Sequence, residues 1–177
     1  MGSAIPLLDI ICIALNAFLV AVIPLQCHLN TGTVFAIRVE MHDFIETETP
    51  LLVSAPSPES QLSPIKTDSG FLITSPEFQM KRLLAGGFEK IYQLARCFRE
   101  SETGPLHNQE FTMLEWYRSN EALEVLMLDI EQIVMHLSGT IGAENFPEKV
   151  PLPPWPRVTV CSLFKKHLSL IMFLCFM

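Results

Sequence analysis

The sequence has few basic residues, and no run of them. It contains 12 Lys and Arg against 19 Asp and Glu, which gives a net charge of −7. Proteins that bind nucleic-acid backbones without sequence preference do so through clustered Lys and Arg. The composition therefore disfavours a non-specific nucleic-acid surface.

Cysteine patterns that hold metals or form redox pairs are also absent. The five cysteines are scattered, with no C-x-x-C pair and no Cys/His spacing typical of zinc sites. We therefore predict that no metal site is built from protein side chains. Reduced cysteines in a cytoplasmic protein explain an odd, scattered set most simply.

Charge is scarce in the first part of the chain, where Asp9 is the only charged side chain before Arg38. Residues 10–25 carry none, and no Lys or Arg occurs before Arg38, so the basic start of a signal peptide is lacking. The apolar run is short for a membrane span and contains Asn16 and Pro24. We predict a buried helix here, or sequence foreign to the domain; membrane contact through residues 5–25 is the less favoured alternative.

The rest of the 177 residues suits one domain that can bury a core without disulfides or metal. Two neighbouring segments alternate as strands do, residues 91–99 and 110–118. Gly104 and Pro105 between them favour a loop, so we predict an antiparallel pair. One face of the pair collects Ile91, Gln93, Ala95, Cys97, Arg99, Phe111, Met113, Glu115 and Tyr117.

A helix is predicted over residues 76–85, after a short apolar strand. Ser75 is its expected cap, Pro76 suits the first helical position, and Gly86-Gly87 ends the helix. Ser75 and Glu77 thus lie at a strand-to-helix turn. Capping alone explains both residues, and a role in a binding site is the alternative.

Two more helices and a loop complete the predicted domain. Residues 35–44 have a helical apolar pattern, and the Ser- and Pro-rich segment 54–69 is typical of a surface loop. A third helix is predicted from Ser119 or Asn120 to Gly139. Its apolar stripe, which we expect to pack on the sheet, consists of Leu123, Met127, Ile130, Val134 and Leu137.

Polar residues on the shared strand face suit a nucleotide and an amine. Arg99 offers a forked donor for phosphate, while Glu115 and Tyr117 suit an ammonium group. The loop adds three side chains able to reach a base or a phosphate, Glu102, His107 and Asn108. A purely structural explanation stays open, in which Arg99 pairs with Glu115 across the hairpin.

The segment FRESETGPLHNQEFTMLEWYR, residues 98–118, resembles motif 2 of class II aminoacyl-tRNA synthetases. The segment HNQEFTMLEWY is most similar to the lysyl branch, as are the segments TSPEFQMKRLLAGG and YQLARCFR upstream. The ending EWYR resembles the stand-alone paralogues that attach (R)-β-lysine to a lysine of elongation factor P. The match covers about residues 44–137.

The resemblance implies an α+β fold, an antiparallel sheet flanked by helices. It implies that lysine or (R)-β-lysine is activated with ATP and Mg²⁺ as an aminoacyl-adenylate and then transferred to elongation factor P. Complete members are expected to be homodimers. Lysyl-tRNA synthetase, with tRNA as partner, is the alternative, but the residues before position 44 are too few for an anticodon-binding barrel.

The resemblance also implies roles for individual residues. Arg99 is the expected catalytic residue, because it would hold the ATP α-phosphate and stabilise the charge that develops at phosphorus. The expected ATP-binding residues are Arg99, Glu100, Ser101, Glu102, His107 and Asn108. The expected amino-acid-binding residues are Ser75, Pro76, Glu77, Glu115 and Tyr117, in a cleft that Arg99 shares. No metal-ligating residue is predicted.

The sequence also departs from the family pattern. Ser101 stands where an acid is expected, Gln109 replaces the usual Pro, and Asp43 stands where Gly is usual. Motif 3, a Gly-rich segment with a second ATP-binding Arg, has no counterpart, since Arg157 is the only Arg after Arg118. The chain is therefore expected to lack the last part of the fold.

This departure implies a division of the chain and a second alternative for its function. The expected parts are an apolar extension at 1–33, a partial catalytic domain at 34–160 and a divergent apolar tail at 161–177. A non-catalytic fragment is the second alternative. We expect the 177-residue chain by itself to show no lysine- or β-lysine-dependent exchange of pyrophosphate into ATP.

Overall fold

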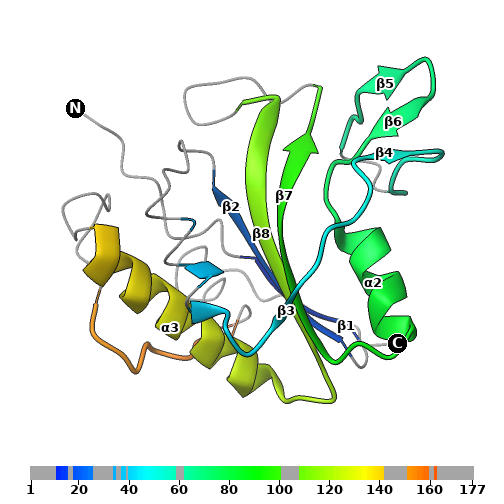
Figure 1. Ribbon diagram of the computed structural model, residues 1–177. Helices are drawn as coiled ribbons and strands as arrows, with labels where there is room; N and C mark the ends of the chain where they lie inside the picture. The colour runs from blue at the N-terminus through cyan, green and yellow to red at the C-terminus, as the bar shows by residue number, and fades with distance from the viewer. Residues whose placement is uncertain are drawn as a thin grey trace, which may run out of the picture.

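The computed structural model describes residues 11–15, 18–25, 34, 37–38, 40–58, 62–100, 108–141, 151–159 and 162. Two layers of helix flank a central sheet (Figure 1). The elements are β1 (Ile11–Leu15), β2 (Phe18–Leu25), β3 (Ile45–Glu46), β4 (Leu52–Val53), β5 (Lys66–Thr67), β6 (Gly70–Leu72), α2 (Glu77–Ala85), β7 (Lys90–Phe98), β8 (Glu110–Ser119) and α3 (Leu123–Ile141).

The strands β7 and β8 form the centre of a five-stranded sheet with the order β1-β2-β8-β7-β3. They are antiparallel, with Ile91 opposite Tyr117 and Phe98 opposite Glu110, which confirms the predicted strand pair. β3 joins β7 in parallel. Strands β4, β6 and β5 make a separate small sheet beside the main one.

One face of β7 and β8 is covered by α3 (Figure 1). Tyr92, Leu114 and Trp116 point to this face and pack with buried apolar residues of the helix. Those helix residues are Leu126, Ile130, Ile133, Val134 and Leu137. Each fully buried large apolar side chain contributes about 1.5–3 kcal/mol, so this cluster is the main core. It confirms that the helix packs on the sheet, but the predicted stripe is only partly right, because Met127 lies outside the cluster and Leu126 and Ile133 belong to it.

The opposite face is covered at two places and carries polar residues between them. At one end Met80 and Leu84 of α2 pack against Ile91 and Tyr117. At the other end Ile73 packs with four strand residues, Ala95, Cys97, Phe111 and Met113. The stretch of sheet between the two clusters carries the polar side chains on which the candidate site is built.

The ends of α2 follow the sequence signals with a shift of one residue. Ser75 Oγ accepts a hydrogen bond from the backbone N–H of Glu77 at 3.0 Å, and the helix begins at Glu77, with Pro76 just before it. The N–H of Gly86 reaches back to the last carbonyls. Gly87 has a φ of 100°, a conformation that favours glycine.

The end predicted for α3 at Gly139 is wrong. The helix begins at Leu123 and continues through Gly139 to Ile141. A glycine inside a helix costs about 1 kcal/mol relative to alanine, and the apolar contacts of α3 with the sheet outweigh that cost. Asn120 has a φ of 59° and lies in the turn between β8 and the helix.

The buried helix predicted within residues 10–25 is also wrong, because β1 and β2 form an antiparallel pair there and β2 pairs with β8. An apolar run alone does not separate helix from strand. The free edge of β8 offers a row of backbone donors and acceptors, and pairing satisfies them. No helix in the described part of the chain is long and apolar enough to span a membrane.

The remaining predicted segments are described only in part. Residues 34, 37–38 and 40 are helical, and the N–H of Met41 donates to the carbonyl of Ile37 at 2.9 Å. The connector 151–159 is held against α3, because the N–H of Trp155 donates to Glu131. Residues 5–10 and most of the tail lie outside the described residues, and the division of the chain into three parts stays a prediction.

Candidate functional site

A buried carboxyl group lies at the centre of the polar stretch, on the sheet face opposite α3. Glu115 of β8 has an exposed fraction of 0%. Ser75, at the entrance to α2, donates its hydroxyl to Glu115 Oε2 at 3.0 Å, and Tyr117 OH donates to Glu115 Oε1. The strand alternation puts Glu115 and Tyr117 side by side, and the strand-to-helix turn brings Ser75 to them from 40 positions away along the chain.

Burial dominates the electrostatics of this group. It raises the pKa of Glu115 to about 7, although the hydrogen bonds from Tyr117 and Ser75 favour the charged form. Burial and the neighbouring carboxylate also raise the pKa of Tyr117 far above its usual value, so the phenol stays a donor. A carboxylate held by two hydroxyl donors can accept an ammonium group.

Glu77 and Lys81 extend the polar surface along the first turn of α2. Lys81 Nζ donates to Glu77 Oε1, and both side chains are about one-third exposed. This pair is one helical turn apart, an arrangement that stabilises helices modestly. Glu77 is also near Glu115, because its negative charge helps to raise the pKa of Glu115. Glu77 already has a cationic partner, Lys81.

Arg99, just after β7, lies at the other end of the same face. Its guanidinium is 5.0 Å from the ring centroid of Phe111, and its Nε donates to the carbonyl oxygen of Thr74 at 3.3 Å. Thr74 directly precedes Ser75. The structure therefore places Arg99, Glu115 and Tyr117 on one face, as the alternation predicted, and brings Ser75 to that face, as the resemblance implied.

The other predicted site residues are less completely described. Pro76 is buried between Ser75 and α2. Glu100 and Asn108, on either side of residues 101–107, are exposed, and the N–H of Glu100 donates to the carbonyl of Ser63 at 2.9 Å. The predicted ATP-binding residues that lie outside the described part of the chain are Ser101, Glu102 and His107.

Two buried residues of the site were not singled out in the sequence. Gln93 lies opposite Glu115 in the β7–β8 register, and its Oε1 accepts a hydrogen bond from Thr49 Oγ1 at 3.0 Å. The exposed fractions of Gln93 and Thr49 are 3% and 7%. The available signal was the amide of Gln93 on an otherwise apolar stretch of a strand face.

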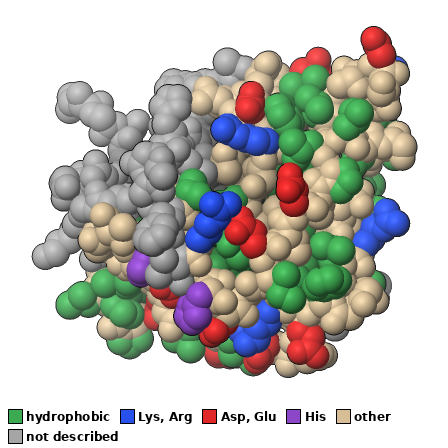
Figure 2. All heavy atoms as spheres, in the orientation of Figure 1, with side chains coloured by type: hydrophobic (Ala, Val, Ile, Leu, Met, Phe, Trp, Pro, Cys, Tyr) green, Lys and Arg blue, Asp and Glu red, His purple; other side chains and the backbone are tan. Residues whose placement is uncertain are grey.

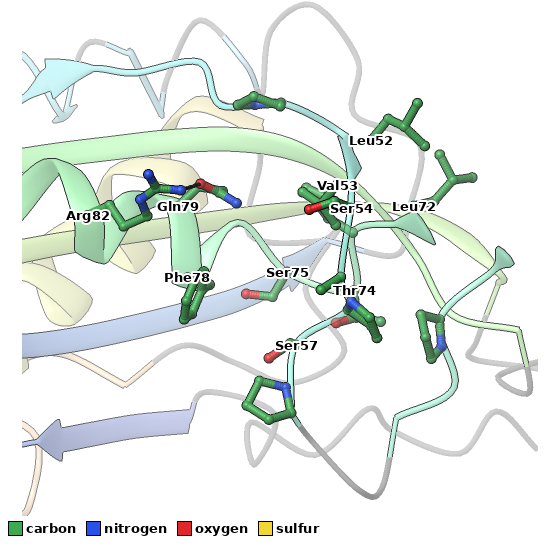
Figure 3. Close-up of a pocket in the computed structure, with 16 residues that line it drawn as sticks. Leu52, Val53, Ser54, Ser57, Leu72, Thr74, Ser75, Phe78, Gln79 and Arg82 are labelled. Carbon is green, nitrogen blue, oxygen red and sulfur yellow. Dashed lines mark hydrogen bonds between the residues drawn. The ribbon is translucent and has the colours of Figure 1, made fainter. Parts of the chain in front are cut away.

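A cavity of about 490 Å³ opens next to Ser75. Figure 3 shows Thr74 and Ser75 among the residues that line it, with Phe78, Gln79 and Arg82 of α2 to one side. Small-molecule sites usually have volumes of about 300–1,000 Å³, so the cavity has the size of a ligand site. The strand β4 and the following loop, residues 52–58, form the opposite wall.

The charged side chains of the surface do not gather into one patch. On the face shown in Figure 2, Lys and Arg are interspersed with Asp and Glu among the described residues. In the same part of the chain, no group of three or more His, Cys, Asp and Glu side chains could hold a metal ion. The distinctive polar feature is therefore the buried site around Glu115.

Comparison with known proteins places the chain in a family. The elongation factor P–(R)-β-lysine ligases of Photorhabdus laumondii and Enterobacter are each 40% identical to it over 111 residues, 57% of this chain and 34% of the relative. The chain thus spans about a third of the length of these curated relatives. The family model described as tRNA synthetases class II (D, K and N) matches residues 26–169. The chain belongs to this class II tRNA synthetase family.

Proposed function

We propose that this chain provides part of a site that activates lysine or (R)-β-lysine with ATP, for transfer to a lysine of elongation factor P. The observation that carries the proposal is the buried carboxyl of Glu115, held by Ser75 and Tyr117 on the face that also bears Arg99. The names of the relatives support the amino acid and the acceptor. The α+β fold with its antiparallel strands agrees with the family.

In the proposed reaction, the substrate carboxylate attacks the α-phosphorus of ATP and displaces pyrophosphate. Arg99 would donate to the α-phosphate and stabilise the charge that builds up there. Glu115 and Tyr117 would bind the terminal ammonium group of the substrate, and Glu77, which pairs with Lys81 in the free chain, would take the other ammonium group. The acceptor amine of elongation factor P then attacks the carbonyl carbon of the adenylate, and AMP leaves.

Mg²⁺ is expected to accompany ATP. Magnesium in nucleotide sites is usually held by phosphate oxygens, by water and by one or two carboxylates. We expect the ATP phosphates and water to supply most of its coordination. This chain's own contribution would then be the guanidinium of Arg99.

A binding measurement tests the amino-acid half of the proposal on the 177-residue chain. Isothermal titration calorimetry should detect lysine or (R)-β-lysine, and norleucine, which lacks the terminal ammonium, should bind at least tenfold more weakly. Glu115→Gln should remove most of this preference, because the amide cannot offer a charged acceptor. Equal binding of lysine and norleucine would contradict the proposal.

A chimera tests the reaction without requiring it of the 177-residue chain alone. Residues 44–137 would replace the matching segment of the Photorhabdus ligase, and lysine- or β-lysine-dependent exchange of pyrophosphate into ATP would be measured. Arg99→Ala should lower exchange about 10²–10³-fold, the usual effect of losing one transition-state donor. The control Arg96→Ala changes an exposed arginine on the other face of β7 and should leave exchange intact.

The acceptor is tested with the same chimera. Transfer of labelled β-lysine to elongation factor P should exceed transfer to lysine tRNA. The reverse result would favour the lysyl-tRNA synthetase alternative. The family description also covers the synthetases for lysine (K). A folded chimera without exchange, beside an active Photorhabdus enzyme, would contradict the proposed activity.

A further inference from the structure

Gln93 and Glu115 form a buried pair across the two central strands. They are direct register partners in β7 and β8, and their exposed fractions are 3% and 0%. Residues opposite each other in an antiparallel pair have Cβ atoms about 4.5–5.5 Å apart and point to the same face. The amide and the carboxyl therefore share one small region between the two apolar clusters.

The amide of Gln93 is held in place from a third segment. Thr49 donates its hydroxyl to Gln93 Oε1 at 3.0 Å. The segment that carries Thr49 is attached to β7 two residues earlier. There, the N–H and the hydroxyl of Thr47 donate to the carbonyl of Tyr92 at 2.8 and 3.1 Å. A buried amide that is anchored at its oxygen presents its NH₂ group in a defined direction.

Among the described residues of this region, Glu115 is the carboxyl group that has no cation at salt-bridge distance, although the charges of Glu77 and Lys81 both act on it. From α2, Glu77 is paired with Lys81. From β7, burial raises the pKa of the Cys97 thiol to about 12, so that group is neutral. From β8, Tyr117 is a neutral donor. Gln93 lies directly opposite Glu115. A glutamate at position 93 would have nearly the same size and would add a second carboxyl group beside Glu115.

We propose that Gln93 is a specificity-determining residue, which keeps the buried floor beside Glu115 at a single carboxylate and so selects ligands with one ammonium group at this point. This inference rests on the proposed function, in which Glu115 binds an ammonium of the substrate. Thr49 is the positioning residue that fixes the amide. A glutamate in place of Gln93 would have the same shape but would favour a ligand with two positive charges.

The first experiment measures, without any ligand, the charge of the buried side chains at positions 93 and 115. The carboxyl carbon of Glu115 is titrated by ¹³C NMR in the 177-residue chain and in its Gln93→Glu and Gln93→Met variants. In Gln93→Glu the two carboxyls should titrate as a pair, and the weaker acid should be at least tenfold weaker than Glu115 in the parent chain. Gln93→Met, which adds no charge, should not produce this second step. An unchanged titration of Glu115 in Gln93→Glu would overturn the inference.

Gln93→Glu is expected to lose stability as the pH rises, because two buried carboxyls must then ionise. The double variant Gln93→Glu/Glu115→Gln keeps the test decisive if the single variant unfolds above pH 7. The double variant should be more stable than Gln93→Glu at pH 8 and about equal to it at pH 5. Equal stability of the two at both pH values would also overturn the inference.

The second experiment measures ligand charge selectivity with cadaverine and pentylamine, which carry two ammonium groups and one. Gln93→Glu should raise the affinity ratio of cadaverine to pentylamine about tenfold over the parent chain, and Gln93→Met should leave the ratio unchanged. An unchanged ratio in Gln93→Glu would contradict the inference. Failure of the parent chain to bind any amine would instead count against the proposed function, while the titration of Glu115 would still test Gln93.

Discussion

At the scale of single residues, both the fold and the candidate site depend on buried ionisable side chains. Glu115 shows this most directly, because burial raises its pKa to about 7 while two hydroxyl groups donate to it. Near neutral pH such a carboxyl is part protonated and part ionised. Its environment therefore links the stability of the fold to the chemistry of the candidate site.

Glu115→Gln should change how stability depends on pH. The pKa of Glu115 is higher in the folded protein than in the unfolded chain, so the folded state binds more protons between about pH 4.5 and 7. Stability from this group is fully present below pH 4.5 and is lost as the pH rises through 7, on the order of 3 kcal/mol in total. Urea denaturation at pH 5 and pH 8 should show a smaller loss in Glu115→Gln than in the parent chain.

Ser75→Ala should weaken the protein through two lost hydrogen bonds. Ser75 Oγ accepts from the N–H of Glu77 and donates to Glu115. The expected cost is about 1–2 kcal/mol in the free energy of unfolding, measured by urea denaturation at pH 8. Ser75→Thr, which keeps the hydroxyl, is the control; equal losses in both variants would show that the hydroxyl is not the cause.

At the scale of elements, Gly87 after α2 and Gly139 within α3 have opposite effects on stability. Gly87 ends α2 with a φ of 100°, and a side chain there is strained although no atom lies within 4 Å of its added Cβ. Gly139 lies inside α3, is exposed and has equally open space. The first glycine is required by the backbone, and the second weakens the helix.

Alanine substitution should therefore separate the two positions. Gly87→Ala should lower the free energy of unfolding by about 1–2 kcal/mol, the cost of a left-handed residue with a Cβ. Gly139→Ala should raise it by about 0.5–1 kcal/mol, since alanine favours the helix and restricts the unfolded chain. Thermal or urea unfolding measures both, and a stabilising Gly87→Ala would contradict the turn geometry.

The attachment of α3 to β8 includes a buried ion pair. Asp129 accepts two hydrogen bonds from Arg118 at 2.7 and 2.8 Å and one from Trp116 Nε1 at 3.2 Å. Asp129→Ala should destabilise the protein by about 3–5 kcal/mol, because Arg118 is left buried without its partner. Glu46→Gln breaks an exposed pair with Arg38 and should cost less than about 1 kcal/mol. Similar losses in the two variants would contradict this assignment.

At the scale of the whole molecule, Glu131 of α3 and the packing of Trp155 tie the connector 151–159 to the core. Glu131 is 4% exposed, accepts from the N–H of Trp155 at 2.9 Å and pairs with Arg157 at 2.7 Å. It thereby holds a Pro-rich segment against α3. Removing this side chain should release the connector without disrupting the sheet.

Glu131→Ala should shift the fluorescence of Trp155 to longer wavelength, since the indole becomes more exposed to water. The change is measured in a Trp116→Phe background, and we expect a stability loss of about 1–2 kcal/mol. Glu124→Ala, an exposed change in the same helix, should leave the emission unchanged. An unshifted spectrum in Glu131→Ala would show that other contacts hold the connector.

The sequence by itself determined the central strands and the face they share. Alternation of side chains put Arg99, Glu115 and Tyr117 on one side, because successive residues of a strand point to opposite faces. The apolar stripe of α3 and the glycines after α2 were also predictable, since both are local patterns. The family could be inferred in the same way from the motif 2 wording, and the family match agrees.

Only the tertiary structure decided which distant segments meet. The partner of residues 18–25 is the edge of β8, which no local pattern specifies. The contact of Ser75 with Glu115 joins two elements 40 residues apart, and that of Thr49 with Gln93 joins two segments 44 apart. Hydrogen bonds of this kind depend on how the chain packs in space, so the sequence could supply the residues of the site but not their partners.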